Sequence, residues 1–259
     1  MTSTQAITGC QMGDIAEHVF LSGDPARIDA ITAGWTGCQE VCRVREFRIV
    51  SGQLEGLPVT AASTGIGAPS TAILVEELAN LGARTLIRVG NSGGLDPSLE
   101  IGDLVITTAA IRDDGTSKSY VLPEFPAASH FEVTGALARA AQDSDRPCRL
   151  GVTWSFDAFY ARNAVLGSDG TLQPMSFGAY PPPDFEARIH AIRATGALNC
   201  EMESGVLLTL ATLYGLRAGC ICVVSDRTPW PGPAAIDLGR NMDDCIAIAT
   251  KAMLDLARS

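Results

Sequence analysis

Arg27 stands at the end of a short polar turn that could bind a small anion. The turn, Gly23-Asp24-Pro25-Ala26-Arg27, follows an apolar stretch and precedes a helical pattern, so Asp24 is suited to cap a helix and Pro25 to occupy its first turn. Backbone N–H groups at a helix start carry partial positive charge, and an arginine one turn in can grip an oxyanion with two hydrogen bonds. The same motif is also compatible with an ordinary capped helix and a solvated arginine.

Arg88 is a second candidate for anion binding. It lies in the otherwise apolar stretch Thr85 to Gly90, and a polar, glycine-rich segment, Asn91 to Gly94, follows. A buried arginine is costly unless it meets an anion or a carboxylate, and the carboxyl ends of strands are where open α/β sheets bind their ligands. We therefore expect Arg88 either to bind an anion or to form a structural salt bridge.

Two acidic motifs late in the chain could supply hydroxyl recognition and a proton. Glu203, in Glu201-Met202-Glu203-Ser204, precedes an apolar helical pattern, and its carboxylate could accept hydrogen bonds from two vicinal hydroxyls. Asp226 and Arg227 follow an apolar strand, where an acid beside an arginine could donate a proton or hold a polar ligand. Capping and packing are the alternative roles for these residues.

Two loops limit the choice of ligand. The loop from Ser63 to Ser70 connects a strand to a helix but lacks the third glycine of a dinucleotide-binding fingerprint, so we expect no nicotinamide and no other organic cofactor. The stretch from Ala161 to Asp184 is rich in glycine, proline and small polar residues. Loops of this length in compact domains are usually functional, and we predict an active-site cover.

Short apolar segments alternate with helical patterns along the chain, which is typical of an α/β domain around a buried, parallel or mixed sheet. We expect one domain over residues 1–259. Strands are predicted at Val19 to Ser22, Arg45 to Ser51, Pro58 to Ser63, Thr85 to Gly90, Asp103 to Ile111 and Gly219 to Ser225. Helices are predicted at Pro25 to Ala33, Ser70 to Leu81, Glu132 to Ala141, Phe185 to Ala194, Glu203 to Tyr214 and Ala234 to Ala257.

The composition excludes several classes of partner. The formal net charge of -10 over 259 residues repels polyanions, so we expect no nucleic-acid partner and only local capture of anions. Neither a secretory leader nor a membrane span is expected, since the most apolar region, Val206 to Val224, is broken by Gly215, Arg217 and Gly219. None of the eight cysteines stands in a Cys-x-x-Cys pair, and reduced structural thiols in the cytoplasm are expected.

Several motifs together give the chain a family resemblance. The run STGIGAPSTAILVEELANLGARTLIRVGNSGGLDPSLEIGDLVITTAAIRDDGTSKSY and the blocks GDPAR, REF, GVTWSFDAFY, NCEMES and GLRAGCICVVSDRT resemble the nucleoside phosphorylase superfamily, most closely its uridine phosphorylases. The resemblance implies an α/β fold whose central mixed sheet is partly closed into a barrel flanked by helices. It also implies a homo-oligomer, a hexamer assembled as a trimer of dimers with shared active sites.

The implied reaction is phosphorolysis of the N-glycosidic bond of a nucleoside, which gives free base and ribose 1-phosphate. The resemblance assigns phosphate to Gly23, Arg27, Arg88, Asn91 and, from the neighbouring subunit, Arg45. It assigns ribose to Met202 and Glu203. It assigns the base to Ser92, Gly93, Phe159 and Asn163, and base departure to Asp226 and Arg227. A monovalent cation, such as K⁺, is expected between subunits at Glu46, Ile66 and Ser70.

Five positions depart from the uridine phosphorylase pattern. One is Asn91, which stands where the family usually has a threonine or serine that contacts phosphate and ribose. Asn163 and Val165 stand where these enzymes read uracil with glutamine and arginine, and Val165 cannot replace a cationic donor. Asp226 resembles the aspartate with which purine-cleaving relatives protonate the base. Ile7 replaces a histidine that bonds the ribose 5′-hydroxyl, which suggests a 5′-modified sugar. Purine or 5′-modified nucleosides are therefore alternative substrates, and a hydrolytic nucleosidase and a non-catalytic nucleoside-binding protein remain alternative functions.

Overall fold

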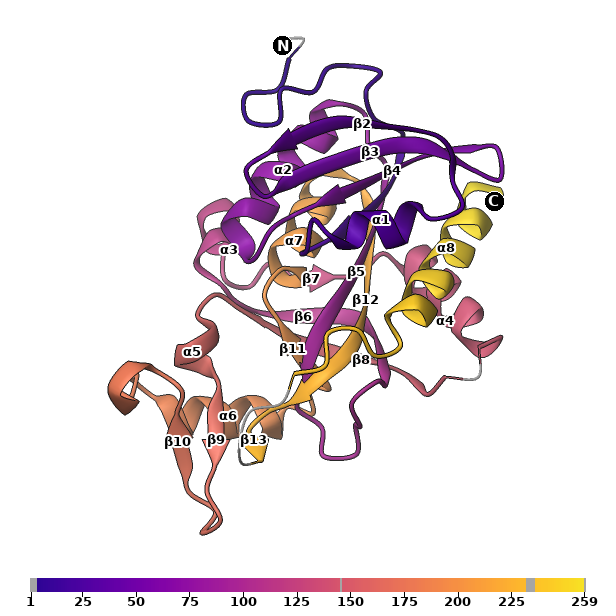
Figure 1. Ribbon diagram of the computed structural model, residues 1–259. Coiled ribbons are helices and arrows are strands. Elements are labelled where there is room, and N and C mark those ends of the chain that lie inside the picture. The colour runs from indigo at the N-terminus through magenta and orange to yellow at the C-terminus, as the bar shows by residue number, and fades with distance from the viewer. Residues whose placement is uncertain (1–3, 145, 232–235, 259) are drawn as a thin grey trace.

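The computed structural model describes residues 4–144, 146–231 and 236–258. Its main sheet has ten strands (Figure 1). They are β1 (His18–Ser22), β2 (Thr36–Val44), β3 (Phe47–Leu54), β4 (Leu57–Ser63), β5 (Thr85–Gly94), β6 (Leu104–Asp113), β7 (Ala127–Ala128), β8 (Cys148–Phe156), β11 (Asn199–Glu201) and β12 (Arg217–Arg227). A separate small sheet contains β9 (Ala164–Leu166), β10 (Leu172–Pro174) and β13 (Trp230–Pro231).

Part of the main sheet closes into a five-stranded barrel. The closing order is β5-β12-β6-β8-β11, with β11 pairing back onto β5. From β5 the sheet also continues outward through β1, β4, β3 and β2. The predicted α/β class, with a mixed sheet partly closed into a barrel, is therefore confirmed.

β5 belongs to both parts of the sheet and changes its neighbour midway. Its first residues, Thr85 to Arg88, pair with β1, whereas its last two residues, Gly93 and Gly94, pair with β11. Between these pairings one edge of β5 has no partner strand. A change of neighbour of this kind opens a crevice at the ends of the strands, where α/β proteins bind ligands.

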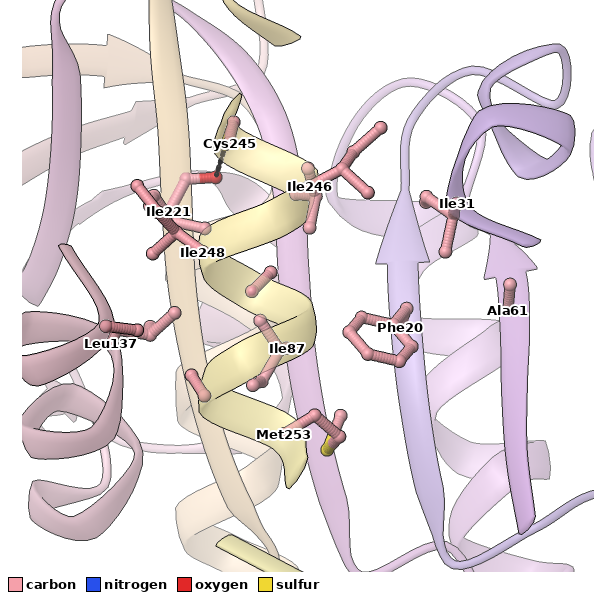
Figure 2. Close-up of a cluster of buried hydrophobic side chains, with 14 of the residues drawn as sticks. Phe20, Ile31, Ala61, Ile87, Leu137, Ile221, Cys245, Ile246, Ile248 and Met253 are labelled. Atoms are coloured by element: carbon pink, nitrogen blue, oxygen red, sulfur yellow. Dashed lines mark hydrogen bonds between the residues drawn. The ribbon is translucent and has the colours of Figure 1, made fainter. Parts of the chain in front are cut away.

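Helices cover both faces of the sheet because successive residues of a strand point to opposite sides. The helices are α1 (Arg27–Thr32), α2 (Ala68–Asn80), α3 (Gly115–Tyr120), α4 (Phe131–Gln142), α5 (Phe159–Arg162), α6 (Phe185–Ala194), α7 (Ser204–Tyr214) and α8 (Met242–Arg258), with a 3₁₀ turn at Phe177–Ala179. On one face, α8 packs on Phe20, Ile87 and Ile221 (Figure 2). On the other face, α2 and α7 form the second large core with the alternate residues Val19 and Leu21.

The structure corrects four details of the predicted elements. Arg45 forms a turn, so β3 begins at Phe47, and α1 begins only at Arg27. Asp24 therefore does not cap the helix but accepts a hydrogen bond from the backbone N–H of Ala26, at 2.8 Å, within the preceding turn. The last helix begins at Met242 and residues 236–241 are not helical, while the predicted start at Ala234 lies outside the described residues.

The predicted loop at 161–184 also contains regular structure. β9 and β10 form a short antiparallel hairpin within it. Its three-residue strands are too short to show an alternating pattern, so the glycine and proline content dominated the prediction. No helix within the described ranges is long and apolar enough to cross a membrane.

Candidate active site

A cavity of about 660 Å³ opens beside the unpaired edge of β5. Residues from distant parts of the chain meet there, from the turns after β1 and β4, the ends of β5, β8, β11 and β12, and the segment before α8. The sequence-predicted residues that line it are Gly23, Arg27, Glu46, Ile66, Arg88, Asn91, Ser92, Gly93, Phe159, Asn163, Met202, Glu203 and Asp226. Three predicted site residues do not line the cavity: Arg45, Ser70 and Arg227.

Arg27 enters the cavity without a carboxylate partner. Its guanidinium donates to Ser22 Oγ at 3.2 Å and to Asn91 Oδ1, but it forms no ion pair with any described residue. Burial lowers the pKa of Arg27, and the nearby positive charge of Arg88 lowers it further. A cation that is desolvated and repelled in this way gains from a bound anion.

Arg88 combines the two roles that its position suggested. It is 3% exposed, and its Nε donates to Glu201 Oε2 at 3.1 Å while its Nη2 pairs with Glu203. Its Nη1 is buried and has no hydrogen-bond partner. A Cβ built on Gly23 would lie 3.9 Å from this Nη1, so the free donor faces the turn that carries Arg27. Arg88 therefore forms a structural salt bridge and still offers one N–H group to an anion.

Glu203 lines the cavity and forms an ion pair with Arg88. Its Oε1 accepts the backbone N–H of Gly67 at 2.6 Å. Burial raises the pKa of Glu203, although the charge of Arg88 opposes the shift. Each carboxylate oxygen retains a further lone pair, so this side chain can still accept hydroxyl hydrogens from a sugar.

Asp226 lines the cavity from the end of β12. It is 7% exposed, its Oδ1 accepts from Ser225 Oγ at 2.8 Å, and burial raises its pKa despite that hydrogen bond. Its Oδ2 approaches the β5 backbone so closely that a Cβ on Gly93 would lie 3.0 Å away. Position 93 therefore favours glycine, and the carboxyl group is suited to hold and donate a proton.

Phe159 and Asn163 form the wall next to Asp226. Asn163 Oδ1 accepts from Thr228 Oγ1 at 3.0 Å, and its Nδ2 donates to the carbonyl of Phe159 at 3.0 Å. These bonds fix the amide, which keeps one N–H for a ligand. The ring of Phe159 meets Trp230 edge-on, with 6.2 Å between centroids. The wall thus offers an aromatic surface and one amide donor.

Arg227 does not reach the cavity, contrary to the expected contact with the base. It donates to the carbonyl of Pro97 at 2.9 Å and lies 3.9 Å from Glu100. The pairing of β12 with β5 shifts register between Val224 and Asp226, and neighbouring strand residues point to opposite faces. Because Asp226 points inward, Arg227 points outward.

Arg45 lies in the exposed turn between β2 and β3, with φ of 54°. Its side chain does not line the cavity of its own chain. This placement is compatible with the expected reach into a neighbouring subunit, which stays a prediction.

The three candidate cation-binding residues lie close together, and two of them, Glu46 and Ile66, line the cavity. Gly65, with φ of 69°, lets Glu46 pack against the loop, since a Cβ there would lie 2.6 Å from Glu46 Cγ. Ser70 Oγ is 3.4 Å from the carbonyl oxygen of Ile66 and donates to that of Thr64 at 2.6 Å. Ile66 itself is 79% exposed. Within the described residues no group of three His, Cys, Asp or Glu side chains could hold a metal ion.

Among the contributors to this site that sequence reasoning overlooked are one carboxylate and two apolar residues near the C-terminal helix. Glu201, considered only as a helix cap, also pairs with Arg88 and accepts the backbone N–H groups of Glu203 and Ser204, each at 2.9 Å. Ile236 and Leu238 line the cavity from a segment predicted to be helical. A second carboxylate two residues before Glu203 was the available signal for Glu201, whereas nothing local marked the two apolar residues.

Comparison with known proteins agrees with this arrangement. The model of the phosphorylase superfamily matches residues 17–258. The chain is 44% identical to a uridine phosphorylase of Thermococcus kodakarensis, over 83% of this chain and 74% of that protein. It is 37% identical to the uridine phosphorylase of Escherichia coli, over 92% of this chain and 91% of that protein. It is also 36% identical to a guanosine phosphorylase of Halorubrum lacusprofundi, over 82% of this chain and 79% of that protein.

A solved structure shares the whole architecture. It is the uridine phosphorylase of Vibrio fischeri ES114 in complex with 6-hydroxy-1-naphthoic acid, with a TM-score of 0.80 and 25% sequence identity. The match covers 98% of this chain and 97% of that one. The similarity therefore extends over both the barrel and the open part of the sheet.

Proposed function

The chain belongs to the phosphorylase superfamily and is a nucleoside phosphorylase that cleaves the N-glycosidic bond with phosphate, and we propose that its preferred substrates are purine nucleosides. The observation that carries this proposal is the buried carboxyl group of Asp226, whose raised pKa favours the protonated form. Among the described residues, Arg27 and Arg88 are the only lysines or arginines that line the cavity, and neither forms an ion pair with Asp226.

Phosphate is proposed to bind between Arg27 and Arg88. One of these guanidinium groups lacks a carboxylate partner and the other has a free Nη1, so together they provide donors directed at a common space near Gly23. Asn91 fixes Arg27 by accepting its Nη2 hydrogen bond. A hydrolytic nucleosidase would not need such an anion site, which supports phosphate rather than water as the attacking group.

The sugar is proposed to lie over Met202 and Glu203, between phosphate and base. Stretching the ribose–base bond leaves positive charge on the sugar, and a phosphate held beneath it stabilises that charge and then forms the new bond. The carboxylate of Glu203 would accept the 2′- and 3′-hydroxyls. Because the site would hold both phosphate and nucleoside in place, a phosphate oxygen and the ribose carbon that carries the base would meet without a further loss of entropy.

The departing base explains the preference for purines. A purine can leave as a neutral molecule when it is protonated on its imidazole ring, and one protonated carboxyl group supplies that proton. Uracil leaves as an anion spread over two carbonyl oxygens, which several donors or a cation stabilise best. The proposal is supported by Asp226, which lines the cavity, and by Arg227, which does not line it and donates instead to the carbonyl of Pro97. Uridine is the second candidate substrate. It is supported by the uridine phosphorylases to which the chain is similar and by the free N–H of Asn163.

A panel of nucleosides tests the base directly. With phosphate present, we expect kcat/KM for inosine or guanosine to exceed that for uridine by about tenfold or more, since one well-placed proton donor commonly contributes at least that factor. Without phosphate, turnover should vanish. Uridine as the best substrate would contradict the purine proposal, and phosphate-independent turnover would contradict phosphorolysis. A 5′-deoxy analogue in the panel tests the effect of Ile7.

We also propose that the enzyme is a hexamer built from dimers and that Arg45 completes the phosphate site of the neighbouring subunit. The exposed position of Arg45 outside its own cavity supports this. Glu46, Ile66 and Ser70 offer three oxygen atoms from one chain, and a symmetric pair of such half-sites suits K⁺. The free cysteines support action in the cytoplasm, in nucleoside salvage or catabolism.

Mixing two inactive variants tests the sharing of sites. Arg45→Ala and Arg27→Ala should each be nearly inactive alone. In mixed oligomers, a subunit that keeps Arg27 can receive Arg45 from its partner, so roughly a quarter of the sites should recover if dimers form at random. If Arg45 served its own subunit, no mixed site would be complete and activity would not return.

A further inference from the structure

The base side of the cavity is carried by a small lobe that stands apart from the main sheet. Figure 1 shows α5, α6, β9, β10 and β13 together at one side of the barrel. The hydrophobic core of this lobe is small, with Ala164, Phe185 and Ile189 buried and Leu172 packed against them. Since little apolar area fixes it, polar contacts must contribute to holding it against the barrel.

α5 is the part of this lobe that touches the cavity. It is one helical turn, it contains Phe159, and Asn163 follows it directly. None of its own side chains is buried, and a single turn is not stable by itself. The position of these two cavity-lining residues therefore depends on contacts with other elements.

Asp113, at the end of β6, supplies such contacts from the barrel. Its carboxyl group is 8% exposed and does not line the cavity. Oδ1 accepts from Arg188 of α6 at 3.1 Å, and Oδ2 accepts from Trp154 of β8 at 3.1 Å. Oδ2 also lies 3.7 Å from Nε of Arg162 in α5. One buried carboxylate thus joins the barrel to both helices of the lobe.

We propose that Asp113 is a positioning residue that sets the affinity for the nucleoside by fixing α5 against the barrel. Removing its charge leaves Arg162 and Arg188 near one another with no carboxylate between them, and like charges repel. Two hydrogen bonds next to α5 would remain, from Thr228 to Asn163 and from the Gly115 N–H to Asp157, so α5 would be held less firmly against the barrel. The proposed phosphate ligands Arg27 and Arg88 bind Ser22, Asn91, Glu201 and Glu203 and neither Asp113 nor its two arginine partners, so phosphate binding should not depend on this contact.

The variant Asp113→Asn tests this role, measured with the nucleoside that the wild type cleaves fastest. Asparagine keeps the shape but loses the charge. We expect KM for nucleoside to rise about 5- to 20-fold and KM for phosphate to change less than about twofold, because small displacements of a positioning wall act on the ligand that it contacts. The matched control is Asp143→Asn, which removes an exposed carboxylate paired with Lys251 away from the cavity and should change neither constant.

Arg162→Gln gives a second, milder test, since this side chain is partly exposed. It should raise the nucleoside KM in the same direction, and the double variant should be no worse than Asp113→Asn alone, because both changes break one interaction. An unchanged nucleoside KM in both variants, or equal increases in both KM values, would overturn the proposal. The base preference of the wild type is measured separately, so a wrong purine proposal would not produce either result.

Discussion

Replacing Asp226 by asparagine is expected to lower kcat for inosine by about 100-fold or more, the range that a general acid usually contributes. Asparagine preserves the size of the side chain and the hydrogen bond from Ser225 Oγ, but it has no proton to transfer to the base. KM for phosphate should stay within about twofold, because Arg27 and Arg88 are unchanged. Steady-state kinetics with both substrates varied would measure the two effects separately.

A substrate that needs no proton provides the control for this prediction. 7-Methylinosine carries a positive charge on its imidazole ring and leaves as a neutral base without an acid. Asp226→Asn should therefore cleave it within about fivefold of the wild-type rate, because the missing proton transfer no longer matters. Equal losses on inosine and 7-methylinosine would show that Asp226 acts through structure and not as an acid.

The pH profile gives an independent check on the same group. In the proposed mechanism the protonated carboxyl group of Asp226 is the active form, and burial raises the pKa of this group. kcat/KM for inosine should therefore fall as the pH rises through this raised pKa, since the proton is lost. Asp226→Asn should lack this fall while keeping the dependence that comes from phosphate.

The order of residue types in the sequence predicted much of this site. Gly23, Arg88 and Asp226 each lie at the end of an apolar run, and a buried strand that ends in a polar residue marks the edge where ligands bind. The orientation of Arg227 could not be predicted in this way, because the irregular pairing at Ser225 is invisible in the sequence. The pairing of Glu201 with Arg88 joins residues 113 positions apart, so no local pattern could reveal it.

Physical reasons also explain why several strands were not predicted from the sequence. Most of β2 is exposed at the edge of the sheet, so it lacks the apolar pattern of a buried strand. β8 begins with Cys148-Arg149-Leu150-Gly151, where a charge and a glycine interrupt the apolar run. β11 has three residues yet closes the barrel, and closure depends on two distant strands and not on its own composition.

Arg27 and Arg88, the two arginines proposed to bind phosphate, should differ sharply in their effect on stability. Arg88→Met removes the partner of two buried carboxylates, Glu201 and Glu203, and breaking such a buried pair costs about 3–5 kcal/mol of the free energy of unfolding. Arg27→Met removes a partly buried cation that no described carboxylate neutralises, so stability should stay the same or increase. Thermal and denaturant unfolding of both variants would measure the difference.

Both substitutions should nevertheless damage phosphate use, with kcat/KM for phosphate falling by about 100-fold or more, as is common when a preorganised donor to a reacting group is lost. The stability lost in Arg88→Met should partly return at low pH. Burial raises the pKa of Glu203, so the folded state binds a proton more readily than the unfolded state and gains stability as the pH falls through that pKa. If Arg88→Met kept wild-type stability at every pH, Arg88 would not be the counter-ion of these carboxylates, and its proposed double role would be wrong.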